Sequence, residues 1–106
     1  MGIMVICAFR PKPGKDDELL GVVRDHLPIL RGLGLATERP TLAMKAKDGT
    51  VVEVFEWVSS EAIERAHHDP EVRKLWDRYE ACSDYIKVNQ VPESDQMFAG
   101  YEPIDL

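Results

Sequence analysis

The sequence predicts one α+β domain, a ferredoxin-like fold with strands and helices in the order β-α-β-β-α-β and a four-stranded antiparallel sheet. Two observations lead to this prediction. A run rich in Val, Phe and Trp at positions 51–58 is typical of a strand, and it turns directly into a helical pattern. Asp48-Gly49 stands just before that run, where it suits the tight turn of a hairpin. With 106 residues, the chain from 1 to 106 has the length of a single domain.

The N-terminal part predicts a strand followed by a helix. The strand is expected at Ile3–Phe9, where apolar side chains alternate onto both faces. An acidic run beginning at Asp16 suits the positive end of a helix, and apolar residues then recur at helical spacing as far as Leu30. Pro28 lies inside this pattern and is expected to kink the helix, which Gly34 helps to end.

The middle of the chain predicts a hairpin and an interrupted helix. The paired strands are expected at Thr41–Lys47 and Val51–Val58. A serine pair then offers a cap for the next helix, and Asp69-Pro70 restarts that helix, which should end near Cys82. The stretch 84–96 is expected to be a loop with at most one helical turn. Met97–Ile104 is predicted as the last strand.

Composition restricts the class of protein. The chain is 44% hydrophobic and 30% charged, as in ordinary globular domains, and its net charge of -6 disfavours binding to nucleic acid. No stretch approaches the ~20 apolar residues of a membrane span, and the first residues lack the pattern of a signal peptide. We therefore expect a cytoplasmic protein without membrane contact, in which Cys7 and Cys82 form no disulfide.

The sheet is expected to need a partner. Two helices cover one face of a four-stranded sheet, yet the strands at Ile3–Phe9 and Val51–Val58 are apolar on both faces. No further covering element is evident in the sequence. A second copy of the same sheet is the simplest cover, so the chain predicts a homodimer through the open sheet face.

Several segments together resemble the dimeric α/β-barrel superfamily, and within it the small proteins described as antibiotic-biosynthesis-monooxygenase-like (ABM-like). The matching segments are FRPKPGKDDELL, KDGTVVEVFEW and SSEAIERAHHDPEVRKLW, and with the opening strand they span nearly the whole chain. The superfamily includes cofactor-free monooxygenases of aromatic polyketides or quinols, haem-degrading monooxygenases and proteins without known activity. The asparagine that the haem-degrading branch carries in its first strand is missing from Ile3–Phe9.

Two histidines are candidate catalytic groups, and three aromatic residues are candidate ligand-binding groups. His67 shares an apolar helical stripe and should point inward, and His26 lies on the first helix close to Pro28. Either has a pKa suited to a base in a pocket, although each can equally be a hydrogen-bonded core residue. The aromatic candidates are Trp57, Trp76 and Tyr79, which are also ordinary core residues.

Other chemistry is not indicated by the sequence. His67 and His68 are adjacent and point about 100° apart on a helix, which disfavours a shared metal ion. Glu53 and Glu56 lie on opposite faces of one strand, so they are not a catalytic pair, and one of them is expected to face an inward arginine or the dimer seam.

The functional hypothesis is therefore a monooxygenase without cofactor or metal. It would oxidise a small aromatic or quinol-like substrate in a cavity between helices and sheet, with His67 or His26 as the base. The alternative is a homodimer without catalytic activity that binds a small ligand or serves a structural role, with both histidines in its core.

Overall fold

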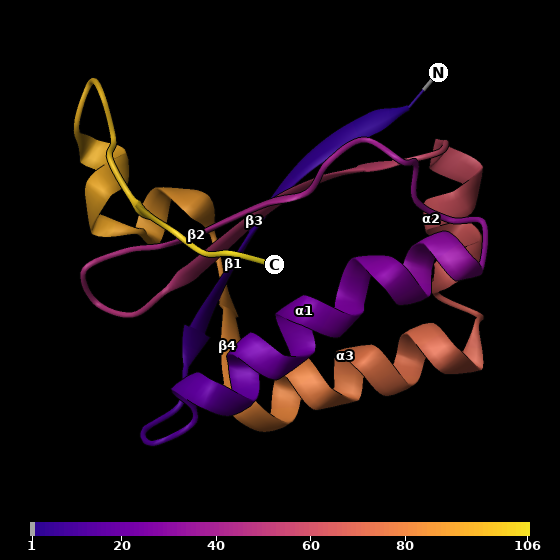
Figure 1. Ribbon diagram of the computed structural model, residues 1–106, viewed down its shortest axis with the longest axis horizontal. Helices are drawn as coiled ribbons and strands as arrows, with labels where there is room; N and C mark the ends of the chain where they lie inside the picture. The colour runs from indigo at the N-terminus through magenta and orange to yellow at the C-terminus, as the bar shows by residue number, and fades with distance from the viewer. Residues whose placement is uncertain (1) are drawn as a thin grey trace.

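The computed structural model describes residues 2–106 as an α+β fold with three α-helices and a five-stranded antiparallel sheet. The sheet has the strand order β4-β1-β3-β2-β5. Helices α1 and α3 run side by side beneath one face of the sheet (Figure 1). The strands are β1 (Ile3–Pro11), β2 (Leu42–Lys45), β3 (Val51–Trp57), β4 (Ser83–Ile86) and β5 (Glu102–Pro103). The helices are α1 (Asp16–Gly32), α2 (Ser60–Ala66) and α3 (Pro70–Cys82), with short 3-10 helices η1 (Val88–Gln90) and η2 (Pro92–Asp95).

The predicted hairpin is confirmed. Strands β2 and β3 pair antiparallel from Lys45↔Val51 to Leu42↔Val54. Gly49 at the tip has a φ of 92°, which a side chain would disfavour, and the Asp48 carboxylate accepts the amide of Thr50 at 2.9 Å. The turn chemistry therefore sets the register of β2 against β3, the central strand of the sheet.

The helices begin where the capping signals place them. Ser59 accepts the amide of Ala62 at 3.1 Å, and Asp69 accepts the amides of Glu71 and Val72 at 2.8 and 3.3 Å. The interruption predicted at Asp69-Pro70 thus separates α2 from α3. Helix α1 continues through Pro28 to Gly32.

The prediction for the C-terminal segment was wrong. Strand β4 at Ser83–Ile86 overlaps the loop predicted at 84–96, and only Glu102–Pro103 of the predicted strand Met97–Ile104 joins the sheet. Strand β4 follows α3 without a loop and pairs with β1, for example through Phe9↔Tyr85. Four residues are too few for a clear alternation in the sequence. Met97 and Phe98, at the start of the predicted strand, are 92% and 88% exposed.

The second face of the sheet is covered in part by the chain itself, contrary to expectation. The segment with η1 and η2 crosses this face near the hairpin, where Val91 packs in a cluster with Ala8, Ala46 and Val52. The rest of the face stays open, and there Met4, Ile6 and Leu42 are 51%, 56% and 61% exposed. The reason for expecting a partner therefore applies to half of the face only.

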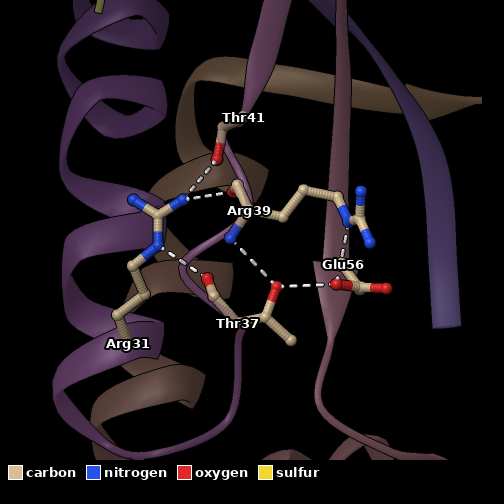
Figure 2. Close-up of polar contacts among 5 residues, drawn as sticks. All are labelled: Arg31, Thr37, Arg39, Thr41 and Glu56. Carbon is tan, nitrogen blue, oxygen red and sulfur yellow. Dashed lines mark hydrogen bonds and ion pairs between the residues drawn. The ribbon is translucent and has the colours of Figure 1, made fainter. Parts of the chain in front are cut away.

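A polar cluster fixes the loop between α1 and β2 (Figure 2). The Arg31 guanidinium donates to the carbonyls of Thr37 and Arg39, each at 2.8 Å, and to the Thr41 hydroxyl at 3.3 Å. The Glu56 carboxylate of β3 accepts from the Thr37 hydroxyl at 2.8 Å and from the Arg39 guanidinium at 3.0 Å. The loop is therefore tied to both the helix and the sheet.

This cluster predicts that the free energy of unfolding changes with pH in the acid range. The hydrogen bonds from Thr37 and Arg39 lower the pKa of Glu56. A carboxylate with a lowered pKa stabilises the fold above its unfolded pKa of about 4.3, and this contribution is lost as the pH falls through the folded value. Glu56→Gln should therefore reduce the free energy of unfolding at pH 7, and its deficit should shrink as acid protonates the native carboxylate.

Urea unfolding at neutral and acid pH measures that deficit. The matched control is Glu102→Gln, which also removes one negative charge but from an exposed side chain. A deficit for Glu56→Gln that stays constant across this range would contradict the assignment.

Candidate ligand cavity

A cavity of about 540 Å³ lies between strand β1 and helix α3 and is partly open to solvent. Its size falls within the usual range for small-molecule sites, about 300–1,000 Å³. The wall is mostly aromatic and aliphatic. The strands contribute Val5, Cys7, Phe9, Phe55, Trp57 and Tyr85 to this wall, and the helices contribute His26, Trp76 and Tyr79.

A buried glutamate supports the floor of this cavity. Glu53 has no exposed surface, and β3 places it opposite Cys7 of β1. One of its carboxylate oxygens lies 2.9 Å from His26 Nδ1, and the other accepts the Tyr79 hydroxyl at 3.0 Å. Both oxygens of a costly buried group are therefore satisfied, by one residue of α1 and one of α3.

The pairing with Glu53 fixes how His26 is presented. A carboxylate accepts hydrogen bonds, so in the neutral form of the imidazole the proton is on Nδ1 and the lone pair is on Nε2. His26 is 4% exposed and meets Phe55 and Tyr79 edge to face, each with ring centroids 5.2 Å apart. The ring is thus held on three sides while it lines the cavity, the arrangement required of an oriented base.

Two further polar groups at the cavity, Tyr79 and Cys7, stay protonated. Burial, together with the charge and hydrogen bond of Glu53, raises the pKa of Tyr79 far above its ordinary value. Burial and the same carboxylate raise the pKa of the Cys7 thiol to about 12. Neither group is a base or an anionic nucleophile at neutral pH. Glu80 also lines the cavity but is exposed, which leaves His26 as the buried candidate base.

The structure brings together four of the five residues selected from the sequence. His26, Trp57, Trp76 and Tyr79 line the cavity, but His67 does not. His67 is exposed, its Nδ1 lies 2.8 Å from the Ile63 carbonyl, and its ring stands against Trp76 at 5.1 Å. The inward orientation predicted for His67 was wrong because α2 ends at Ala66 and the helical stripe ends with it.

Sequence reasoning did not identify Glu53 as the partner of His26. Of the two glutamates on β3, Glu56 pairs with an arginine, the exposed Arg39 at 3.0 Å, whereas Glu53 lies in the core 2.9 Å from His26 Nδ1. One signal was present in the sequence. Glu53 alternates with Phe55 and Trp57 on one strand face, so burying that face also buries the acid, which then needs a donor from the covering helices.

Within residues 2–106, no group of three or more His, Cys, Asp or Glu side chains is placed to hold a metal ion. In the same range, no helix is long and apolar enough to cross a membrane. No protein-family model matches the chain, and no curated protein matches it either.

The buried carboxylate predicts a specific stability loss. Tyr79→Phe removes the hydroxyl and leaves one Glu53 oxygen buried without its donor, which should cost about 1–3 kcal/mol of unfolding free energy. Tyr85→Phe is the matched control because Tyr85 is 53% exposed and its hydroxyl bonds only to the Trp76 carbonyl, at 3.2 Å. The control should stay within about 0.5 kcal/mol. Equal losses for the two variants in urea unfolding would contradict the role given to Glu53.

Proposed function

We propose that the protein is a cofactor-independent monooxygenase that oxidises a small aromatic or quinol-like substrate. The observation that carries the proposal is the Glu53–His26 pair beside an aromatic cavity, with the Nδ1 to carboxylate distance at 2.9 Å. A hydroxyl group on a planar ring can rest among the aromatic side chains and give its proton to Nε2.

In this mechanism the substrate supplies the electrons. His26 Nε2 takes the hydroxyl proton, and the imidazolium is stabilised by the Glu53 carboxylate on its other nitrogen. The electron-rich anion passes one electron to molecular oxygen, and the resulting radicals combine into a carbon-bound peroxide. Loss of water from the peroxide leaves a carbonyl on the ring. One oxygen atom enters the substrate, and the other leaves as water with two substrate hydrogens.

The fold supports the resemblance to the dimeric α/β-barrel superfamily. Without the short strand β5, the sheet order is β4-β1-β3-β2, and the order of elements along the chain is β-α-β-β-α-β with the second helix divided in two. We propose that this is a ferredoxin-like domain of the dimeric α/β-barrel superfamily and that its ABM-like members are its relatives. The partner would be a second copy seated on the open part of the sheet face, where Met4, Ile6 and Leu42 are exposed.

The alternative is a homodimer that binds a small molecule without changing it, or that has only a structural role. A filled core would favour the structural role. The cavity favours a ligand instead, because three residues with polar side chains, His26, Tyr79 and Cys7, line one mostly apolar space. The pairing of His26 with a carboxylate favours proton transfer over binding alone.

Oxygen consumption with a dihydroxynaphthalene tests the proposed reaction. His26→Ala should lower kcat by at least about 100-fold, the usual contribution of a general base. Glu53→Gln should also lower kcat because an amide no longer enforces the Nδ1 proton. His67→Ala is the matched control, since His67 is exposed outside the cavity, and it should keep the wild-type rate. Full binding of the quinol with no oxygen consumption would identify the binding protein instead.

Light scattering tests the dimer. The wild-type protein should have the mass of two chains at micromolar concentration, and Ile6→Asp should shift it to one chain by placing a charge in the apolar interface. Ala81→Asp adds the same charge to an exposed position on α3 and should leave the mass unchanged. A monomer mass for the wild-type protein would exclude this dimer.

A further inference from the structure

Strand β1 has an edge that the sheet does not use. Along one side β1 pairs with β3 over its length from Ile3 to Phe9, but on the other side β4 covers only Ala8 to Pro11. Figure 1 shows β4 beside one half of β1, while the half leading to the N-terminus extends past it. The chain turns away after Ile86, where the Lys87 amide bonds to the Gln90 side chain at 2.8 Å.

The register identifies the backbone groups on this edge. The Glu56 carbonyl accepts the Thr37 amide, and the Val58 amide donates to the Leu35 carbonyl. Both of these β3-side groups therefore point away from β1. In an antiparallel pair, the residues of β1 opposite such positions also turn their backbone groups away from β3. Met4 lies opposite Glu56, and Ile6 lies two residues further along. Their amides and carbonyls have no backbone partner within residues 2–106.

The free edge borders the cavity. Val5, Ile6 and Cys7 of β1 form one wall, and Trp76 and Glu80 of α3 form the facing wall. A strand placed at this edge would direct alternate side chains into the cavity, on the same face as Val5. A slot between a strand edge and a helix is the geometry used for extended peptides by domains that bind through strand addition.

The helix wall carries a charge preference. A shallow groove continues outward from Trp76 and Glu80 and is lined also by His67, Arg73 and Asp77. It holds two carboxylates against one arginine. Burial, followed by the charges of Glu80 and Asp77, raises the pKa of Tyr85 to about 12. The negative charge of these carboxylates therefore extends to the cavity, which Tyr85 lines. Positive side chains on a ligand are favoured here.

We propose that the free edge of β1 at Ile3–Cys7 binds an extended basic peptide segment by antiparallel strand addition, with one aromatic side chain in the cavity. The Met4 and Ile6 backbone groups would supply the hydrogen bonds, and the acidic groove on α3 would attract the flanking positive charges. The bound segment would take the place that a longer β4 would occupy, and it would pair antiparallel with β1 as β4 does. This binding does not require the proposed oxygenase reaction.

The probe is a labelled pentapeptide, acetyl-Lys-Val-Trp-Val-Lys-amide, titrated by fluorescence anisotropy. Its tryptophan lies opposite Val5, and its valines lie opposite Met4 and Ile6 with their amides facing β1. N-methylation of the two valines should weaken binding by at least about tenfold because it removes the pairing donors. N-methylation of the tryptophan is the matched control, because that amide faces away from β1, and it should leave the affinity within about twofold.

The protein side is tested by Ile6→Pro, which removes an edge amide that β3 does not use. This variant should bind the peptide about tenfold more weakly, while its circular dichroism spectrum stays that of the wild-type fold. If this variant unfolds, the methylated peptides still decide the question. No binding at about 1 mM peptide, or equal affinities for the two methylated peptides, would overturn the proposal. It would also be overturned if the peptide dissociated a dimer of this chain, since the edge would then belong to a second copy.

Discussion

The structure depends on the burial of one carboxylate. Glu53 lies in β3, near the middle of the sheet, with no exposed surface. Burying such a group is costly unless donors meet it, and here the donors come from α1 and α3 at 2.9 and 3.0 Å. Both helices must therefore keep their places over the sheet. The same constraint that positions the helices also orients His26 and holds Tyr79 neutral.

The signals that the sequence carried clearly are local ones. Asp48-Gly49 defined the hairpin, and Asp69-Pro70 divided the helix, because turn and cap preferences act within a few residues. The candidate site could be predicted only in part. Tyr79 belonged to a recognisable apolar stripe and His26 lay on the predicted first helix, but their common partner Glu53 is 26 and 27 residues away in sequence. Only the packing of helices on the sheet brings the three together.

The C-terminal segment likewise shows that a strand formed by long-range pairing could not be predicted from the local sequence. Strand β4 exists because β1 offers it a partner, and its four residues have no alternation strong enough to indicate a strand alone. The segment after it uses Val91 to cover one half of the open sheet face. This arrangement changes the reasoning on assembly. The proposed partner copy would cover only the part of the face near Met4 and Ile6, so the interface would be smaller than a whole sheet face.

The short length of β4 also accounts for the position of the cavity. Where β4 pairs with β1, Phe9 stacks on Tyr79 at 4.2 Å and closes the space between strand and helix. Beyond Ile86 the sheet lacks this strand, and the space between β1 and α3 opens as the cavity. The opening and the unpaired edge of β1 therefore share one cause. A longer β4 would satisfy the backbone of Met4 and Ile6 but would also narrow the opening beside β1, so the cavity is open for the same reason that one strand edge is free.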